Sequence, residues 1–309
     1  MRIAVVGAGA MGQLFGAHLV AGGQTVTLID SSEDVCDGIT QNGIQVRMGN
    51  AEFHVLAKAM KAEDCGEVFD LVLIFTKGPH TRSAVESITH LITDQTVGIS
   101  LQNGLGNETP LAEVFGGAQT IIGMTDFPSD RAEDGVIYSE PTGHVVLGGL
   151  TDDAQARAQQ VASILDKSGL NATFDPNVMI PIWEKVIFNA VFNMVSGVTG
   201  LTVGAVYDVP EARSLATGIL NESLRVVRES DIAIDEARIR ENVAHAQRNH
   251  ADHKTSMLLD IENGRPTEIE TIGGAIERLG KSNGTPTPTI SVICNLIRIQ
   301  ERTKQSSLK

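Results

Sequence analysis

The chain has 309 residues, of which 42% are hydrophobic and 20% charged, enough apolar material for more than one folded core. Its 24 lysines and arginines stand against 38 aspartates and glutamates, a formal charge of −14. This acidic balance, without a basic tract, argues against nucleic acid or an anionic membrane as a partner. It does not exclude a small anionic substrate, because a local pocket can be positive on an acidic protein.

Cysteine usage and hydropathy indicate the compartment. Cys36, Cys65 and Cys294 lie far apart without CxxC spacing, which is typical of reduced thiols. The N-terminus lacks the features of a signal peptide, and no stretch approaches the ~20 apolar residues of a membrane span. We therefore expect a cytoplasmic protein.

In the first half of the chain, short β-branched runs alternate with longer amphipathic stretches, the pattern of βαβ units and a parallel sheet. We expect strands at residues 3–6, 25–29, 71–75, 97–101 and 120–123, with helices at 13–21 and 81–92. Residues 135–139 and 143–147 are predicted to form a hairpin that extends the sheet antiparallel.

From about Pro176, helical periodicity replaces the strand pattern. Helices are expected at residues 180–195, 210–231, 235–263, 268–279 and 288–303. The fold prediction is an α/β Rossmann-type N-terminal domain with a parallel sheet, residues 1–174, followed by an all-α C-terminal domain, residues 175–309. The helical domain is expected to contact the substrate and to offer a surface for a homodimer.

A glycine-rich loop follows the first expected strand and opens the first expected helix. It reads Gly7-Ala8-Gly9-Ala10-Met11-Gly12, which fits GxGxxG. In this context Gly7 allows a tight turn, Gly9 lets the backbone approach a pyrophosphate, and Gly12 permits close helix–strand packing. An ordinary turn without a ligand is the alternative. We expect a dinucleotide site.

Asp30 ends the second expected strand, 18 residues after Gly12. Dinucleotide sites place a carboxylate there to hold the adenine ribose hydroxyls. The same carboxylate would repel the 2′-phosphate of NADP, so the sequence favours NAD over NADP. The alternative is a helix N-cap or turn aspartate.

Segment 183–195 is apolar apart from Glu184 and a polar stripe. Lys185, Asn189 and Asn193 are spaced i, i+4, i+8, so they share one helical face. Burying them without partners would cost several kcal/mol, and something polar must face them. The stripe is explained by an internal hydrogen-bonded network, by a solvated edge, or by a substrate cleft between the domains. In such a cleft a lysine with a lowered pKa can donate a proton.

With these features the sequence resembles the ketopantoate reductase family over nearly its whole length. The resemblance is carried by the order and spacing of six motifs: the glycine loop; Phe75-Thr76-Lys77; Leu101-Gln102-Asn103-Gly104; Trp183-Glu184-Lys185 with Asn189 and Asn193; Ser256-Met257-Leu258-Leu259-Asp260; and Pro266-Thr267-Glu268-Ile269.

The resemblance implies a role for each matching residue. Lys185 is expected as the general acid. Asn189, Asn193 and Ser256 are expected to bind the substrate. Glu268 would sit beside the lysine and the nicotinamide ribose, and Lys77 and Asn103 would line the cofactor and reaction site. The alternatives are a capping box of Thr267 and Glu270, a turn asparagine, and solvated serine and lysine side chains.

Two positions depart from the family pattern. Ser31 stands where NADPH-preferring members carry arginine, and His253 stands where an asparagine is often found; we expect His253 to contact the substrate. The resemblance implies NAD(P)H-dependent reduction of a 2-oxo acid, either ketopantoate to pantoate in pantothenate biosynthesis or another acid in the NAD-dependent D-2-hydroxyacid dehydrogenase branch. A dinucleotide-binding sensor without turnover is the alternative from another class.

Three histidines, His245, His250 and His253, lie close together in the sequence. No carboxylate or cysteine completes a recognisable ligand set with them. A solvated helix face explains them, and we expect no metal site.

Overall fold

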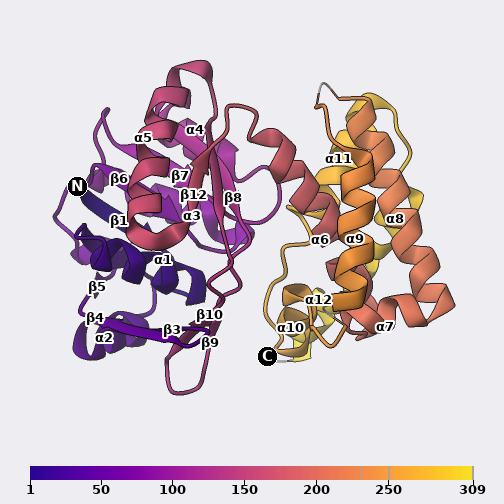
Figure 1. The fold of residues 1–309 in the computed structure, drawn as a ribbon, viewed down its shortest axis with the longest axis horizontal. Helices are drawn as coiled ribbons and strands as arrows, with labels where there is room; N and C mark the ends of the chain where they lie inside the picture. Colours follow the sequence, from indigo (N-terminus) through magenta and orange to yellow (C-terminus); the bar gives the residue numbers. More distant parts are fainter. Residues whose placement is uncertain (231, 250, 308–309) are drawn as a thin grey trace. The chain divides into compact units, whose positions relative to one another are not determined.

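The computed structural model describes residues 1–230, 232–249 and 251–307. Their backbone contacts divide the chain into two compact units (Figure 1). Unit 1 comprises Met1–Gln102 and Asn107–Val178, and unit 2 comprises Asn103–Gly106 and Met179–Lys309. No helix among the described residues is long and apolar enough to cross a membrane.

Unit 1 contains an eight-stranded sheet in the order β12-β11-β8-β7-β6-β1-β2-β5. Its strands are β1 (Arg2–Val6), β2 (Thr25–Ile29), β5 (Lys58–Met60), β6 (Leu71–Ile74), β7 (Val97–Ser100), β8 (Thr120–Thr125), β11 (Val145–Gly149) and β12 (Ala172–Phe174). All neighbours pair in parallel except β8 and β11, which are antiparallel. The predicted Rossmann-type fold class is confirmed.

The central strands are apolar on both faces because helices cover both. In β1, Ile3 and Val5 point into one core and Ala4 and Val6 into the other. The first core also takes side chains from α1 (Ala10–Ala21), α2 (Glu33–Asn42) and α5 (Gln155–Leu165), and the second from α3 (Thr81–Ser87) and α4 (Glu108–Phe115). Because both faces of these strands are buried, successive residues are apolar and the strands read as continuous apolar runs in the sequence.

A second sheet of four strands has the order β4-β3-β10-β9. It comprises β3 (Ile44–Met48), β4 (Ala51–Val55), β9 (Asp130–Arg131) and β10 (Ile137–Ser139). The predicted hairpin of residues 135–147 is therefore wrong: β10 pairs with β3 and β9, whereas β11 pairs with β8 and β12. Fully buried Ile137 finds its partner in β3, a strand that the sequence pattern did not reveal.

Unit 2 is helical. Its helices are α6 (Met179–Thr199), α7 (Val203–Asp208), α8 (Pro210–Arg228), α9 (Glu236–Asn249), α10 (Ser256–Glu262), α11 (Gly273–Asn283) and α12 (Pro288–Ser307). Helix α6 lies at the centre, and α8, α9, α10 and α12 pack against it. The buried Glu222 carboxylate of α8 accepts hydrogen bonds from the backbone of Thr289 and Ile290, each 3.0 Å long, at the start of α12.

The single helix predicted for residues 235–263 is wrong, because α9 and α10 are separate. The carbonyl oxygens of Ala251 and His253 accept bonds from the backbone of Gly204 and Val203 at the start of α7, so they are not used within a helix. Thr255 then caps α10, its Oγ1 accepting from Leu258 N at 3.3 Å. His250 lies outside the described residues.

His18 joins three parts of unit 1. Its side chain is buried, and Nδ1 lies 3.0 Å from the carbonyl oxygen of Ser168, to which it donates. Nε2 lies 3.2 Å from Met48 Sδ. Burial lowers the pKa of His18, and the bond to Ser168 offsets this only in part.

We expect the free energy of unfolding to fall as the pH drops below about 6.5, the ordinary pKa of a histidine side chain. Since the folded state disfavours the proton on His18, the unfolded state binds more protons in this window, with a slope of up to about 1.4 kcal/mol per pH unit. Urea titrations at pH 7.5 and 5.5 should show a smaller loss for His18→Gln than for the unchanged protein. Equal losses would contradict this.

Candidate active site

The glycine loop joins β1 to α1, and its three glycines have different surroundings. A Cβ on Gly7, whose φ is +95°, would lie 2.7 Å from Thr76 N, and one on Gly12 would lie 1.9 Å from Gly7 O. These two glycines are required by the packing of the chain itself. A Cβ on Gly9 would meet nothing within 4 Å. The space beside Gly9 is open. Gly9 is the N-cap of α1, and no side chain caps the helix there, so its first backbone N–H groups can bind a phosphate.

A cavity of about 300 Å³ adjoins this loop. Its described lining includes Gly7, Asp30, Glu63, Thr76 and His80, and no lysine or arginine is found there. Lys61 is close in sequence, but its Nζ lies 4.0 Å from Glu33 Oε2 and 3.7 Å from Glu63 Oε1. The cavity therefore carries acidic rather than basic side chains.

Asp30 lies at the end of β2 and is bonded to the glycine loop. Its Oδ2 accepts from Ala8 N at 2.7 Å, and its Oδ1 accepts from Ser32 N at 3.0 Å. Ser32, rather than Asp30, caps α2, since its Oγ accepts from Val35 N at 3.4 Å. The N-cap interpretation of Asp30 is wrong. The carboxylate anchors the loop and also lines the cavity.

Thr76 was not singled out as a site residue by the sequence analysis. It follows β6, and its Oγ1 is buried with no hydrogen-bond partner among the described residues. A buried unsatisfied hydroxyl is unfavourable, so this atom favours a polar ligand in the cavity. Lys77 follows directly, and its carbonyl oxygen accepts from His80 N at 2.8 Å. The open space at Gly9 and the Thr76 hydroxyl fit a dinucleotide.

The polar stripe lies on α6. Asn193 is buried, with 7% of its surface exposed, and Lys185 and Asn189 are half-buried. Glu184, the neighbour of Lys185, forms an ion pair with Arg238 of α9. One residue of the stripe is therefore buried in unit 2, and the other two are partly exposed.

Ser256 is the first residue of α10, which packs on the same helix, and His253 lies in the segment before α10. Both side chains are exposed. The two helices approach closely at Gly197, where a Cβ would lie 3.1 Å from Ile261 Cδ1 and 3.3 Å from Met257 Cγ. The sequence motifs around Lys185 and Ser256 are thus carried by adjoining helices.

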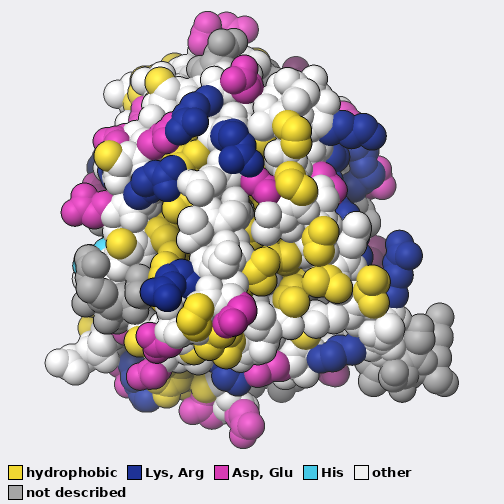
Figure 2. All heavy atoms as spheres, turned by 90° about the vertical axis from the view of Figure 1, so that its right-hand side faces the viewer, with side chains coloured by type: hydrophobic (Ala, Val, Ile, Leu, Met, Phe, Trp, Pro, Cys, Tyr) yellow, Lys and Arg dark blue, Asp and Glu magenta, His cyan; other side chains and the backbone are white. Residues whose placement is uncertain are grey.

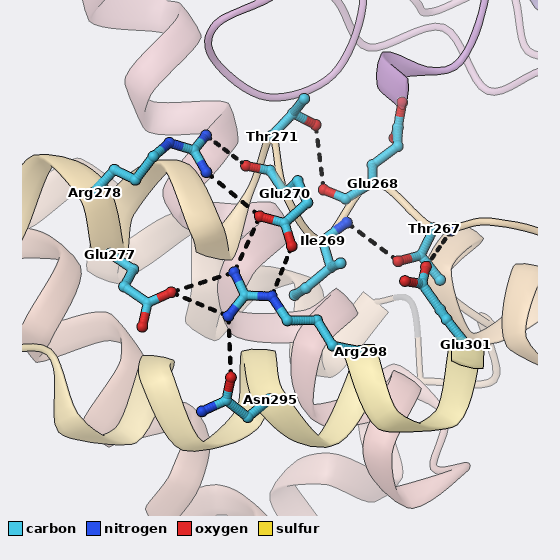
Figure 3. Close-up of polar contacts among 10 residues, drawn as sticks. All are labelled: Thr267, Glu268, Ile269, Glu270, Thr271, Glu277, Arg278, Asn295, Arg298 and Glu301. Carbon is cyan, nitrogen blue, oxygen red and sulfur yellow. Dashed lines mark hydrogen bonds and ion pairs between the residues drawn. The ribbon is translucent and has the colours of Figure 1, made fainter. Parts of the chain in front are cut away.

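Glu268 lies in the turn before α11 (Figure 3). Asn103 Nδ2 donates to Glu268 Oε2 at 3.1 Å, and Leu105 N donates to Thr271 O at 2.7 Å. Gly104 has a φ of +90°, and a Cβ there would lie 2.4 Å from Thr271 O. The segment Asn103–Gly106, which the sequence analysis placed within the first domain, packs with unit 2.

The predicted helix 268–279 is wrong at its start, since α11 begins at Gly273. The capping box is also wrong. Thr267 Oγ1 accepts from Ile269 N at 3.2 Å, and the Glu270 carboxylate is bound by Arg298 of α12 (Figure 3). The Glu270 carboxylate is therefore bound to Arg298 and does not cap a helix that begins at Glu268.

No group of three or more histidine, cysteine, aspartate or glutamate side chains among the described residues could hold a metal ion. His245 lies on α9 and His253 in the segment before α10, where both are exposed.

Comparison with known proteins covers both units. Residues 3–152 match the family model described as ketopantoate reductase PanE/ApbA, and residues 177–301 match its C-terminal counterpart. A 2-dehydropantoate 2-reductase of Streptococcus pyogenes is 29% identical over 97% of this chain and 98% of its own. One of Mesorhizobium japonicum is 30% identical over 96% and 97%. The solved structure of a D-mandelate dehydrogenase with NADH and anilino(oxo)acetate is 28% identical, covering 99% of this chain and 100% of its own, with a TM-score of 0.92.

Proposed function

The chain belongs to the ketopantoate reductase family, and on that premise we propose that it reduces ketopantoate to pantoate with Lys185 as general acid. It is a nicotinamide-dependent oxidoreductase of the 2-oxo acid reductase type. The observation that carries the proposal is the stripe of Lys185, Asn189 and Asn193 on the mostly apolar central helix of unit 2. A sensor without turnover has no need of a positioned acid there.

The residues of unit 2 would act on the substrate. The reduced nicotinamide, when bound, supplies the hydride. Lys185 donates a proton to the carbonyl oxygen as the alcohol forms, and Asn189 and Asn193 orient the substrate by hydrogen bonds. Ser256 contacts the substrate carboxylate region, and His253 also contacts the substrate. Glu268, held by Asn103, orients the lysine and the nicotinamide ribose.

Unit 1 would hold the cofactor, and we propose a preference for NAD(H). The loop from Gly7 to Gly12 would bind the pyrophosphate, with Lys77 and Asn103 nearer the nicotinamide. Asp30 and Glu63 both line the cavity beside the loop, and Lys61 is engaged by glutamates. A 2′-phosphate would meet two carboxylates and no free cation on this described lining, whereas ribose hydroxyls can donate to Asp30.

A second candidate is an NAD-dependent D-2-hydroxyacid dehydrogenase acting on another 2-oxo acid. The similarity to a D-mandelate dehydrogenase with NADH supports it. Asp30 and His253 are the two residues of this chain that favour it. The same Lys185 chemistry would apply, with a different acid in the pocket. We place either reaction in the cytoplasm, and the three buried free cysteines support this.

We also propose that unit 2 forms a homodimer through α12. Val292, Leu296 and Ile299, spaced i, i+4, i+7, are 59%, 42% and 56% exposed. Figure 2 shows hydrophobic side chains gathered on the helical side of the molecule. Exposed apolar stripes mark protein contacts, and a stripe along one helix can pack against its own copy about a twofold axis.

We expect Lys185→Ala to lower kcat by on the order of a hundredfold because the proton donor is lost. Initial rates should be measured with NADH, NADPH, ketopantoate and a panel of other 2-oxo acids. Lys281→Ala, which removes an exposed lysine from α11, is the control. Equal kcat for Lys185→Ala and the unchanged enzyme would remove Lys185 from the mechanism. Faster turnover of another acid than of ketopantoate would select the second candidate.

We expect Asp30→Asn to raise the ratio of kcat/KM for NADPH to that for NADH by roughly tenfold, or about 1.4 kcal/mol. The amide oxygen can still accept from Ala8 N, while the repulsive charge is lost. Asp37→Asn, which removes an exposed charge from α2, should leave the ratio unchanged. An unchanged ratio in Asp30→Asn would mean that this carboxylate does not select the cofactor.

We expect Leu296→Glu to convert a dimer into a monomer, because the stripe would then bury a charge. Light scattering after size exclusion measures the mass. Leu56→Glu, at a site 77% exposed in unit 1, is the matched control. A monomeric unchanged protein, or a dimeric Leu296→Glu, would rule out this interface.

A further inference from the structure

We propose that Arg298 and Glu301 of α12 are positioning residues for Glu268. They hold the turn on either side of it, and the inference rests on the proposed role of Glu268 in the reaction. Figure 3 shows both side chains reaching from α12 to the turn before α11. Neither residue was indicated by the sequence motifs.

Arg298 holds the C-terminal side of Glu268. Its Nε donates to Glu270 Oε1 at 2.6 Å and its Nη2 to Glu270 Oε2 at 3.0 Å, a bidentate pair. Nη1 and Nη2 also lie 3.3 Å from Glu277 Oε2, and Nη1 donates to Asn295 Oδ1 at 3.1 Å. The guanidinium lowers the pKa of Glu270. The bonds to Glu277 and Asn295 fix the guanidinium group, and the guanidinium group restricts the position of Glu270, two residues from Glu268.

Glu301 holds the N-terminal side. Its Oε1 accepts from Thr267 N at 2.7 Å, and Thr267 is itself buried, with 2% of its surface exposed. Glu301 lies three residues after Arg298, so both side chains leave the same face of α12. Thr267, directly before Glu268, and Glu270, two residues after it, are thus both held by α12.

Other contacts also hold the turn: Arg278 Nη2 donates to Glu270 O at 2.8 Å, Thr271 Oγ1 donates to Glu268 O at 3.2 Å, and Leu105 N donates to Thr271 O at 2.7 Å. Helix α11 has Ile272 as its N-cap, without a side-chain cap. The packing of α11 on its neighbours is apolar at Gly273, where a Cβ would lie 2.7 Å from Cys294 Sγ and 2.8 Å from Met194 Sδ. Arg298, through an ion pair, and Glu301, through a hydrogen bond to backbone, are the contacts that reach the turn from α12. They leave the Glu268 carboxylate to be met by Asn103.

The test compares Arg298→Met with Arg298→Lys, and Glu301→Ala with Glu301→Gln. We expect Arg298→Met and Glu301→Ala to lower kcat by about tenfold to a hundredfold, as small displacements of a reacting group do, without changing KM for NADH. Glu301→Gln should keep the kcat of the unchanged enzyme, because its amide oxygen can accept from Thr267 N. Arg298→Lys should have a kcat between those of Arg298→Met and the unchanged enzyme. Arg228→Met, which removes a bidentate pair with Glu236, is the matched control and should keep kcat.

A double-mutant cycle separates positioning from general destabilisation. If Arg298 and Glu301 act through Glu268, Arg298→Met and Glu301→Ala should lower kcat no further in a Glu268→Gln background. Hydrogen exchange of the peptide 266–272 should be faster in both variants and unchanged in Arg228→Met, a readout independent of activity. Full activity of Glu268→Gln would overturn the proposed role of Glu268. An impaired Glu268→Gln, with unaltered kcat and exchange in Arg298→Met and Glu301→Ala, would overturn the positioning proposal alone.

Discussion

Unit 2 depends on the burial of α6. Its apolar side chains face α8, α9, α10 and α12, and twelve of its 21 residues are buried. A helix surrounded in this way leaves few directions in which polar groups can point, so Lys185, Asn189 and Asn193 are confined to one face. The residues that the proposed reaction needs from α10 and from the turn before α11 belong to elements whose positions are set by packing on α6 or its neighbours. The apolar core is therefore what orients the polar site.

In unit 1 the candidate cofactor site combines a closely packed backbone loop with the side chains of Asp30 and Thr76. Gly7 and Gly12 let the strand, loop and helix approach so closely that a methyl group would collide with backbone. Asp30 then fixes the loop through Ala8 N. A single carboxylate therefore both holds the loop and contributes charge to the neighbouring cavity.

Much of this fold could be predicted because its main signals are local. The apolar runs predicted strands whose bounds agree within a few residues with β1, β2, β6, β7 and β8. Helical periodicity did the same for α6, α8 and α12. The errors share a cause. The break between α9 and α10 reflects bonds to α7, about 50 residues away, and the late start of α11 reflects Arg298, 28 residues beyond Glu270.

The same distinction applies to the candidate site. The spacing of Lys185, Asn189 and Asn193 and the glycine loop are visible in the sequence because the chemistry requires particular residues at particular intervals. Glu63, Arg298 and Glu301 belong to no such motif, and Thr76 stands in one without being singled out there. They become recognisable only through an unsatisfied hydroxyl, a cavity wall or a bond to a distant turn.

The segment Asn103–Gly106 has a consequence for the modularity of this chain. Four residues between β7 and α4 belong structurally to the helical unit, where they bond Glu268 and Thr271. A fragment cut at Met179 would lack them, and a chimera that exchanged only the C-terminal halves of two relatives would join a Glu268 turn to a foreign loop. Recombination within such a family has to inherit two separate stretches of chain together, which ties the evolution of the β7–α4 connection to that of the helices.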